Sequence, residues 1–218
     1  MVFLTREGFT TRLGAPWTKT DSVVQMRLAG ANPRASVEGI EPLAQRTHYF
    51  VGNDASKWRS NVPHYAKVRY DEVYPGIDLV YYGRENHLEY DFVVSPGADP
   101  SLIELEFDGF ERTSVEDGEL VLQASAGEIR HQKPYVYQNL NGDRTEVLGR
   151  YVANDRGSIN FKLGDYDHSA DIVIDPVVTM STHLGGSDYD GALALTVDDQ
   201  NRIWVAGQTY SQDFPAPG

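Results

Sequence analysis

Short hydrophobic segments that alternate with turn residues recur along most of this chain, and this pattern limits the folds that it can adopt. The segments expected to be strands include residues 47–51, 65–70, 77–82, 87–94, 102–107, 119–124, 135–140 and 158–163. Pro75-Gly76 and the segment 96–100 separate some of them, because proline fixes φ and glycine tolerates positive φ. Strands spaced about every 8–12 residues with such turns are typical of antiparallel sandwiches or barrels. The sequence therefore predicts an all-β, antiparallel, sandwich-like domain.

The alternation of apolar and charged residues within these segments predicts which side chains are buried. In residues 102–107, Ile103 and Leu105 share one face of the expected strand, whereas Glu104 and Glu106 share the other. Two later segments repeat this half-buried pattern. The side chains expected in the core are Ile103, Leu105, Phe107, Leu120, Leu122, Ile159, Phe161 and Leu163.

The composition excludes several classes of function. A formal net charge of -13 disfavours nucleic acid and anionic membranes, since proteins that bind them concentrate positive charge on one surface. The absence of cysteine excludes disulfide bonds, thiolate metal sites and cysteine nucleophiles. No apolar segment approaches the roughly 18 residues that a membrane-spanning helix requires, so we expect no membrane insertion.

Three carboxylates are candidates for a ligand-binding site. Glu89 and Asp91 are two residues apart and share one face of an expected strand, and Asp78 lies on the preceding strand across the turn 83–86. A glycosidase uses two carboxyl groups about 5–9.5 Å apart, which same-face neighbours of this spacing approach. The competing interpretation is structural, because Lys67 and Arg69 share a face of a neighbouring strand. We predict that these cations pair with Glu89 and Asp91.

Four aromatic residues near these carboxylates allow a second kind of site. Trp58, Tyr70, Tyr74 and Tyr82 lie close in sequence, and an exposed row of their rings would suit stacking against the apolar faces of sugars. The alternative is that they fill the core and only their polar tips reach water. The sequence leaves both interpretations open.

An Asp-rich segment, DYDHSAD, resembles the opening of a calcium-binding loop. Asp165, Asp167, Ser169 and Asp171 alternate along it, but Ala170 stands where an EF-hand loop requires glycine, and Pro176 stands where it requires glutamate. We therefore interpret the segment as a turn and predict no cofactor, with calcium as the alternative.

The six histidines show no closely spaced metal pattern, and no serine lies in a G-x-S-x-G sequence, so no catalytic residue is assigned.

The end of the chain resembles a known repeat family. Residues 179–218 contain STHLGGS, a hydrophobic segment that ends in Val-Asp, then WVAGQT and DFP. These motifs resemble the SBBP family of bacterial β-propeller repeats. The phrases NVPHYAKVRY, VYPGIDLVYYG, LEYDFVVSPGADP and VIDPVV resemble the uncharacterised N-terminal domain that precedes SBBP arrays in bacterial surface and secreted proteins. The resemblance implies a sandwich-like domain over residues 1–176 and a single propeller-type repeat over residues 177–218.

The resemblance also implies a role. It favours a non-enzymatic structural or interaction module of an exported bacterial surface protein, located outside the cell or on its surface. Its partners would be other protein domains or cell-surface glycans, with no nucleic acid. A carbohydrate-binding module is the first alternative, and a glycoside hydrolase using Glu89 and Asp91 is the second. The N-terminal residues lack a signal-peptide pattern. Because proteins of the kind that the chain resembles are generally exported, the resemblance implies that Met1 begins a fragment.

A lone repeat has hydrophobic residues that a neighbouring repeat would normally cover. Leu193, Leu195 and Val197 alternate in one expected strand, and Ile203 and Val205 alternate in the next. We expect the repeat to pack against residues 1–176 or to self-associate with a second copy.

Overall fold

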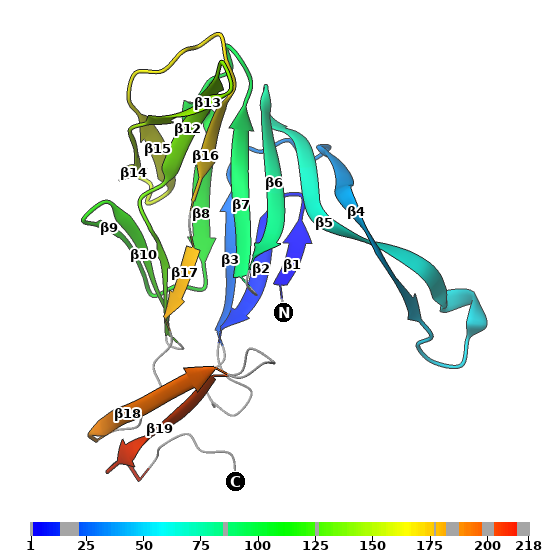
Figure 1. The fold of residues 1–218 in the computed structure, drawn as a ribbon, viewed down its shortest axis with the longest axis vertical. Coiled ribbons are helices and arrows are strands. Elements are labelled where there is room, and N and C mark those ends of the chain that lie inside the picture. Colours follow the sequence, from blue (N-terminus) through cyan, green and yellow to red (C-terminus); the bar gives the residue numbers. More distant parts are fainter. Residues whose placement is uncertain are drawn as a thin grey trace.

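The structure is a computed structural model, and it describes residues 2–13, 22–84, 87–124, 127–176, 178–181, 188–197 and 203–212. Within these ranges the chain forms β-strands and two short 3-10 turns, η1 (Ala55–Lys57) and η2 (Pro100–Leu102), and it has no α-helix (Figure 1). Every strand pairing is antiparallel. The predicted all-β, sandwich-like class is therefore confirmed. No helix in the described ranges is long and apolar enough to cross a membrane.

Two large sheets form the body of the molecule. The six-stranded sheet has the order β1 (Val2–Thr5), β2 (Gly8–Leu13), β3 (Ser22–Leu28), β8 (Glu104–Asp108), β15 (Ile159–Leu163) and β14 (Gly149–Ala153). The seven-stranded sheet has the order β13 (Asp143–Val147), β12 (Tyr135–Leu140), β16 (Ile172–Asp175), β7 (His87–Val94), β6 (Ile77–Arg84), β5 (Arg59–Tyr74) and β4 (Ser36–Tyr49). Figure 1 shows β6 and β7 in front of β2 and β3.

A smaller sheet adjoins the two large ones. It has the order β17 (Val178–Ser181), β11 (Gly127–His131), β10 (Glu119–Ala124) and β9 (Arg112–Glu116). Leu120 and Leu122 of β10 and His131 of β11 are buried in the same core as the two large sheets.

The core lies between the facing sides of these sheets and is rich in aromatic rings. Phe9 of β2 contacts Tyr81 of β6, and Phe92 of β7 contacts Phe161 of β15 at a ring separation of 5.9 Å. Tyr90 is fully buried among them. The predicted core is confirmed for Ile103, Leu105, Leu120, Leu122, Ile159 and Phe161, all of which are buried, and Phe107 and Leu163 pack against it with partial exposure.

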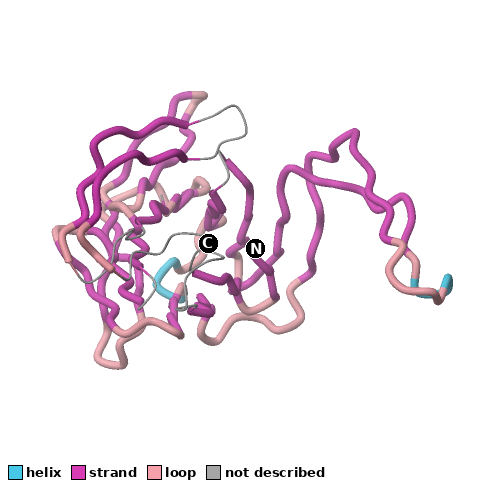
Figure 2. Tube along the Cα trace, turned by 90° about the horizontal axis from the view of Figure 1, so that it is seen from below, coloured by secondary structure: helices cyan, strands magenta, loops and turns pink. Residues whose placement is uncertain are grey.

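A long two-stranded ribbon extends from one edge of the seven-stranded sheet. β4 and β5 continue past the sandwich and are joined by a loop that contains η1, and Figure 2 shows this ribbon projecting to one side of the body. We call residues 42–66 the arm. Only short strands are expected from the sequence in this region, because Pro42 and Pro63 interrupt the alternation that marks a strand. In the structure the register is irregular between Pro42 and Arg46.

The segment predicted to be a propeller repeat contributes to two sheets. β17, its first strand, pairs with β11 and so extends the small sheet. β18 (Asp190–Val197) and β19 (Ile203–Thr209) pair only with each other in the described part of the chain. The predicted cover for Leu193, Leu195, Val197, Ile203 and Val205 concerns side chains that lie outside those that the structure describes.

A histidine lies in the core, which no pattern in the sequence predicted. The His131 side chain is 1% exposed, its Nδ1 atom lies 3.3 Å from the Tyr90 hydroxyl, and its ring contacts Tyr90 and Tyr151. Burial lowers the pKa of His131 to about 4. The neutral imidazole is therefore the form that the core holds at neutral pH.

We predict that His131 makes the fold sensitive to acid. Between pH 6.5 and pH 4 the unfolded state binds a proton at this residue and the folded state does not, so stability present above pH 6.5 is lost as pH falls. The loss amounts to about 3 kcal/mol. Urea unfolding of the wild type and His131→Phe across this range should show their stabilities converging as pH falls. Parallel curves would contradict the prediction.

Candidate functional site

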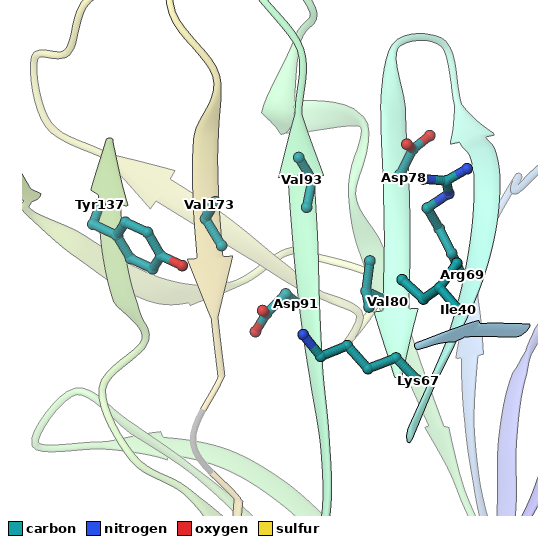
Figure 3. Close-up of a pocket in the computed structure, with 9 residues that line it drawn as sticks. All are labelled: Ile40, Lys67, Arg69, Asp78, Val80, Asp91, Val93, Tyr137 and Val173. Atoms are coloured by element: carbon teal, nitrogen blue, oxygen red, sulfur yellow. The ribbon is translucent and has the colours of Figure 1, made fainter. Parts of the chain in front are cut away.

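The candidate site lies on the open face, which we define as the face of the seven-stranded sheet that points away from the six-stranded sheet. Strand alternation places Tyr81, Tyr90 and Phe92 inside, so their neighbours point outward. The register aligns Arg69, Val80 and Asp91 across β5, β6 and β7. A shallow cavity of about 310 Å³ lies here (Figure 3). It is lined by Ile40, Lys67, Arg69, Asp78, Val80, Asp91, Val93, Tyr137 and Val173.

The carboxyl group of Asp91 lines the cavity and has a shifted pKa. Its Oδ1 accepts a hydrogen bond of 3.0 Å from the Tyr82 hydroxyl, which lies one strand away on β6. Burial and the nearby charge of Asp175 raise the pKa of Asp91 to about 6, although the Tyr82 hydrogen bond and Lys67 act in the opposite direction. Burial and the Asp91 charge also raise the pKa of Tyr82. A carboxyl group with a raised pKa in a cavity is typical of ligand-binding or catalytic sites, and also of structural charge networks.

The predicted pairing of Glu89 and Asp91 with Lys67 or Arg69 is wrong. Lys67 Nζ lies 2.6 Å from a Glu41 carboxylate oxygen. Arg69 binds carboxylates as well, with Glu38 at 3.1 Å and Asp71 at 2.6 Å. β5 has β4 as its other neighbour, and the carboxylates of β4 and of β5 itself reach these cations first. Figure 3 shows Lys67 extending toward Asp91, but no salt bridge joins them in the described part of the chain.

Of the two interpretations that the sequence left open for the four aromatic residues, the exposed row of rings is not formed. Tyr70 and Tyr74 are buried, at 5% and 4% exposure, and Tyr74 donates a 2.9 Å hydrogen bond to the carbonyl of Ala29. A β-bulge between them turns this part of β5 into the core. Trp58 lies far along the arm, so only Tyr82 belongs to the open face.

Asp78 lines the cavity but also has a structural role. Its Oδ1 accepts a 2.8 Å hydrogen bond from the backbone N–H of Glu72. Glu72 lies in the bulge of β5 and has a φ of 50°, a conformation that non-glycine residues adopt at a cost. Asp78 therefore stabilises the bulge beside the cavity.

Sequence reasoning missed Tyr137 and Asp175, which complete the open face. Tyr137 lines the cavity, and the Arg144 guanidinium carbon lies 3.9 Å from the centroid of its ring, a cation–π contact. Asp175 and Val173 are on β16, which pairs with β7 although 80 residues separate them in sequence. Alternation within residues 172–175 could have placed both on one face, but no local signal identifies β7 as the neighbour.

The Asp-rich segment is held by a glutamine. Gln138 is 2% exposed, and its Nε2 donates to the carbonyl oxygens of Asp167, Ala170 and Asp171 at 2.7, 3.3 and 3.3 Å. Its Oε1 accepts a 2.8 Å bond from the Asp167 N–H. The Asp167 carboxylate in turn accepts from the Ser169 N–H and hydroxyl, which lowers the pKa of Asp167. The four predicted metal candidates, Asp165, Asp167, Ser169 and Asp171, thus belong to a hydrogen-bonded turn.

Histidines do not assemble a metal site in the part of the chain that the structure describes. His48 and His64 are on the arm, His131 is in the core and His168 is exposed beside Tyr166. The described residues contain no group of three or more histidine, aspartate or glutamate side chains placed to hold a metal ion.

We predict that Gln138, and not calcium, orders this turn. Gln138→Ala leaves several buried backbone groups without partners and should lower the free energy of unfolding by about 3 kcal/mol. Asp165→Asn, at an exposed position in the same turn, is the matched control and should change it little. Millimolar calcium should not shift the melting temperature of the wild type. A rise of several degrees that a chelator reverses would refute this.

A family model described as a domain of unknown function (DUF7948) matches residues 3–177. The chain belongs to the DUF7948 family. The matched range extends from β1, apart from Val2, to β16, and it therefore contains the arm and the whole cavity. No curated protein and no solved structure matches the chain.

The open face of this DUF7948 domain combines two kinds of surface. Val80, Val93 and Val173 provide an apolar floor, and hydroxyl, carboxyl and cationic groups surround it. Two of the surrounding cations already have carboxylate partners, and Asp91 becomes uncharged below about pH 6. Such a surface can bury apolar area and form polar contacts at its edge.

We predict that Asp91 destabilises the DUF7948 domain at neutral pH. The pKa of Asp91 in the folded state, about 6, lies above its ordinary value of 3.8. The folded state therefore binds more protons between these values, and its stability falls as pH rises through them. Asp91→Asn, which can still accept from Tyr82, should raise the free energy of unfolding at pH 7.5 by about 1–2 kcal/mol after allowance for solvent screening. At pH 4 the gain should vanish. A variant less stable than the wild type at pH 7.5 would show that the charge has a stabilising partner.

Proposed function

We propose that this domain is a non-enzymatic interaction module of an exported bacterial surface protein, in which it precedes β-propeller repeats. The observation that carries the proposal is the cavity on the open face, where Val80, Val93 and Val173 meet charged groups that largely have partners on neighbouring strands. An apolar centre with a polar edge is the usual composition of a protein–protein contact. The SBBP-like motifs after residue 178 supply the expected neighbours, namely other domains of the same protein.

The hydrolase alternative finds less support. It needed Glu89 and Asp91 in an open cleft without Lys67 or Arg69 beside them, and both cations line the cavity with Asp91.

Carbohydrate binding has one specific observation in its favour. Tyr137 lines the cavity, and its ring could stack against a sugar while Asp91 and Tyr82 form polar contacts. It therefore stays the second candidate.

A thiol-protection experiment tests the proposal, because the chain has no cysteine of its own. Val93→Cys places one thiol in the floor of the cavity, and Lys162→Cys places one at an exposed position on β15 as the matched control. A maleimide should modify Val93→Cys at least about tenfold more slowly in a longer chain that carries the following repeats than in the 218-residue chain. Modification of Lys162→Cys should proceed at similar rates in both.

The same variants separate the two candidates. Equal rates for Val93→Cys in both chains would overturn the proposal of an inter-domain contact. Protection of Val93→Cys in the 218-residue chain by a soluble glycan, lost when Tyr137 is changed to Ala, would favour carbohydrate binding instead.

A further inference from the structure

The arm has a surface unlike that of the rest of the molecule. Of its 25 residues, 42–66, the four at 47, 62, 64 and 66 are half-buried and the other 21 are exposed. The exposed ones include large apolar side chains, among them Phe50 at 60% and Val51 at 74% exposure. The other large apolar side chains exposed on the arm are Leu43, Tyr49, Trp58 and Tyr65.

The aromatic side chains near the end of the arm form an ordered cluster. The Phe50 ring lies 5.2 Å from that of Trp58 in an edge-to-face arrangement, and 5.8 Å from the His48 ring in a stacked one. Trp58 Nε1 donates a 3.1 Å hydrogen bond to the Gly52 carbonyl, which fixes the indole. Pre-ordered aromatic side chains of this kind lose little entropy on binding and are frequent in the energetic centres of interfaces.

The arm also carries a charge opposite to that of the body. Arg46, Lys57 and Arg59 are its cations and Asp54 is its one carboxylate, so the arm has a formal charge of +2 and the other residues of the chain sum to -15. Lys57 lies 3.7 Å from Asp54. The two arginines donate to backbone carbonyl groups of the arm and have no carboxylate partner in the described part of the chain.

The geometry of the arm suits a contact along its side. Each strand of the arm has eight residues and is about 25 Å long, at ~3.3 Å per residue. This length exceeds the Debye length, about 8–10 Å, beyond which dissolved salt screens the interaction between two exposed charges. The polar turn 52–57, in which Asp54 caps η1, lies between the two strands beyond Phe50 and Trp58. Insertion of the tip into a lipid bilayer would bury Asp54 and its partner before the aromatic rings, which disfavours a membrane as the occupant.

We propose that the arm docks onto the acidic body of a second copy of this chain, and that the two copies exchange arms in a symmetric dimer. Its 21 exposed residues match the roughly 20–30 residues a side that specific interfaces use. The second copy supplies the complementary negative charge, and a self-complementary contact is the usual form of a two-fold dimer. An isolated two-stranded ribbon is marginally stable in water, so cover by a partner also stabilises the arm itself.

Sedimentation velocity on the 218-residue chain over a concentration series tests this proposal. We expect a dimer whose dissociation constant rises at least about tenfold in the double variant Phe50→Ala with Trp58→Ala. The charge-reversal variant Arg46→Glu with Arg59→Glu should weaken it comparably, and added salt should weaken the wild-type dimer. Leu148→Ala is the matched control, because Leu148 is 82% exposed and lies outside the arm, and it should leave the dimer unchanged.

Three outcomes would overturn the proposal. The first is a wild-type chain that stays monomeric at every concentration. The second is a dimer that both double variants leave intact, which would place the contact elsewhere, for example on the predicted repeat. The third is a monomer that binds phosphatidylglycerol vesicles through Phe50 and Trp58, which would make the arm a membrane anchor. Unchanged far-ultraviolet dichroism, which reports the strands and not the substituted rings, verifies that the body of each variant remains folded.

Discussion

The structure depends on the antiparallel register that joins β5, β6, β7 and β16. Side chains alternate along each strand, so one register places Tyr81, Tyr90 and Phe92 in the core and Val80, Asp91 and Val93 on the open face. A slip of one residue would exchange the two sets and bury Asp91 where Tyr90 now lies. The aromatic core and the cavity are therefore two consequences of one alignment.

The aromatic core tolerates polar atoms that a purely aliphatic core would lack. The Tyr90 hydroxyl forms a hydrogen bond with His131 Nδ1. The hydroxyls of Tyr81 and Tyr151 have no hydrogen-bond partner among the described residues. Each such group costs about 1–3 kcal/mol, which packing of the rings must offset. Tyr90 alone contacts Phe9, Tyr81, Phe92 and His131. The sheets are thus joined by rings large enough to bridge two layers, and a neutral His131 is part of that bridge.

Strand alternation made the fold class and much of the core predictable. It did not make predictable which strands pair with each other. The pattern in residues 102–107 identified Ile103 and Leu105 as buried, and the spacing of Glu89 and Asp91 placed both on one face. The ion pairs were mispredicted because residues 36–46 were not recognised as a strand, so Glu38 and Glu41 were not considered as partners for Arg69 and Lys67. Their cross-strand proximity follows from the fold and not from local sequence.

The arm and the open face differ in how they depend on the fold. The open face is the outer side of core strands, so a change at Val93 or Asp91 acts on the sheet that holds the aromatic core. The arm contributes no residue to the buried core, and its two strands contact each other. Sub-regions with few buried contacts open at lower free energy than the core, so the arm can gain or lose order independently of the body. Binding at the arm is therefore separable from folding, and variants of Phe50 or Trp58 report on association without the loss of stability that core substitutions cause.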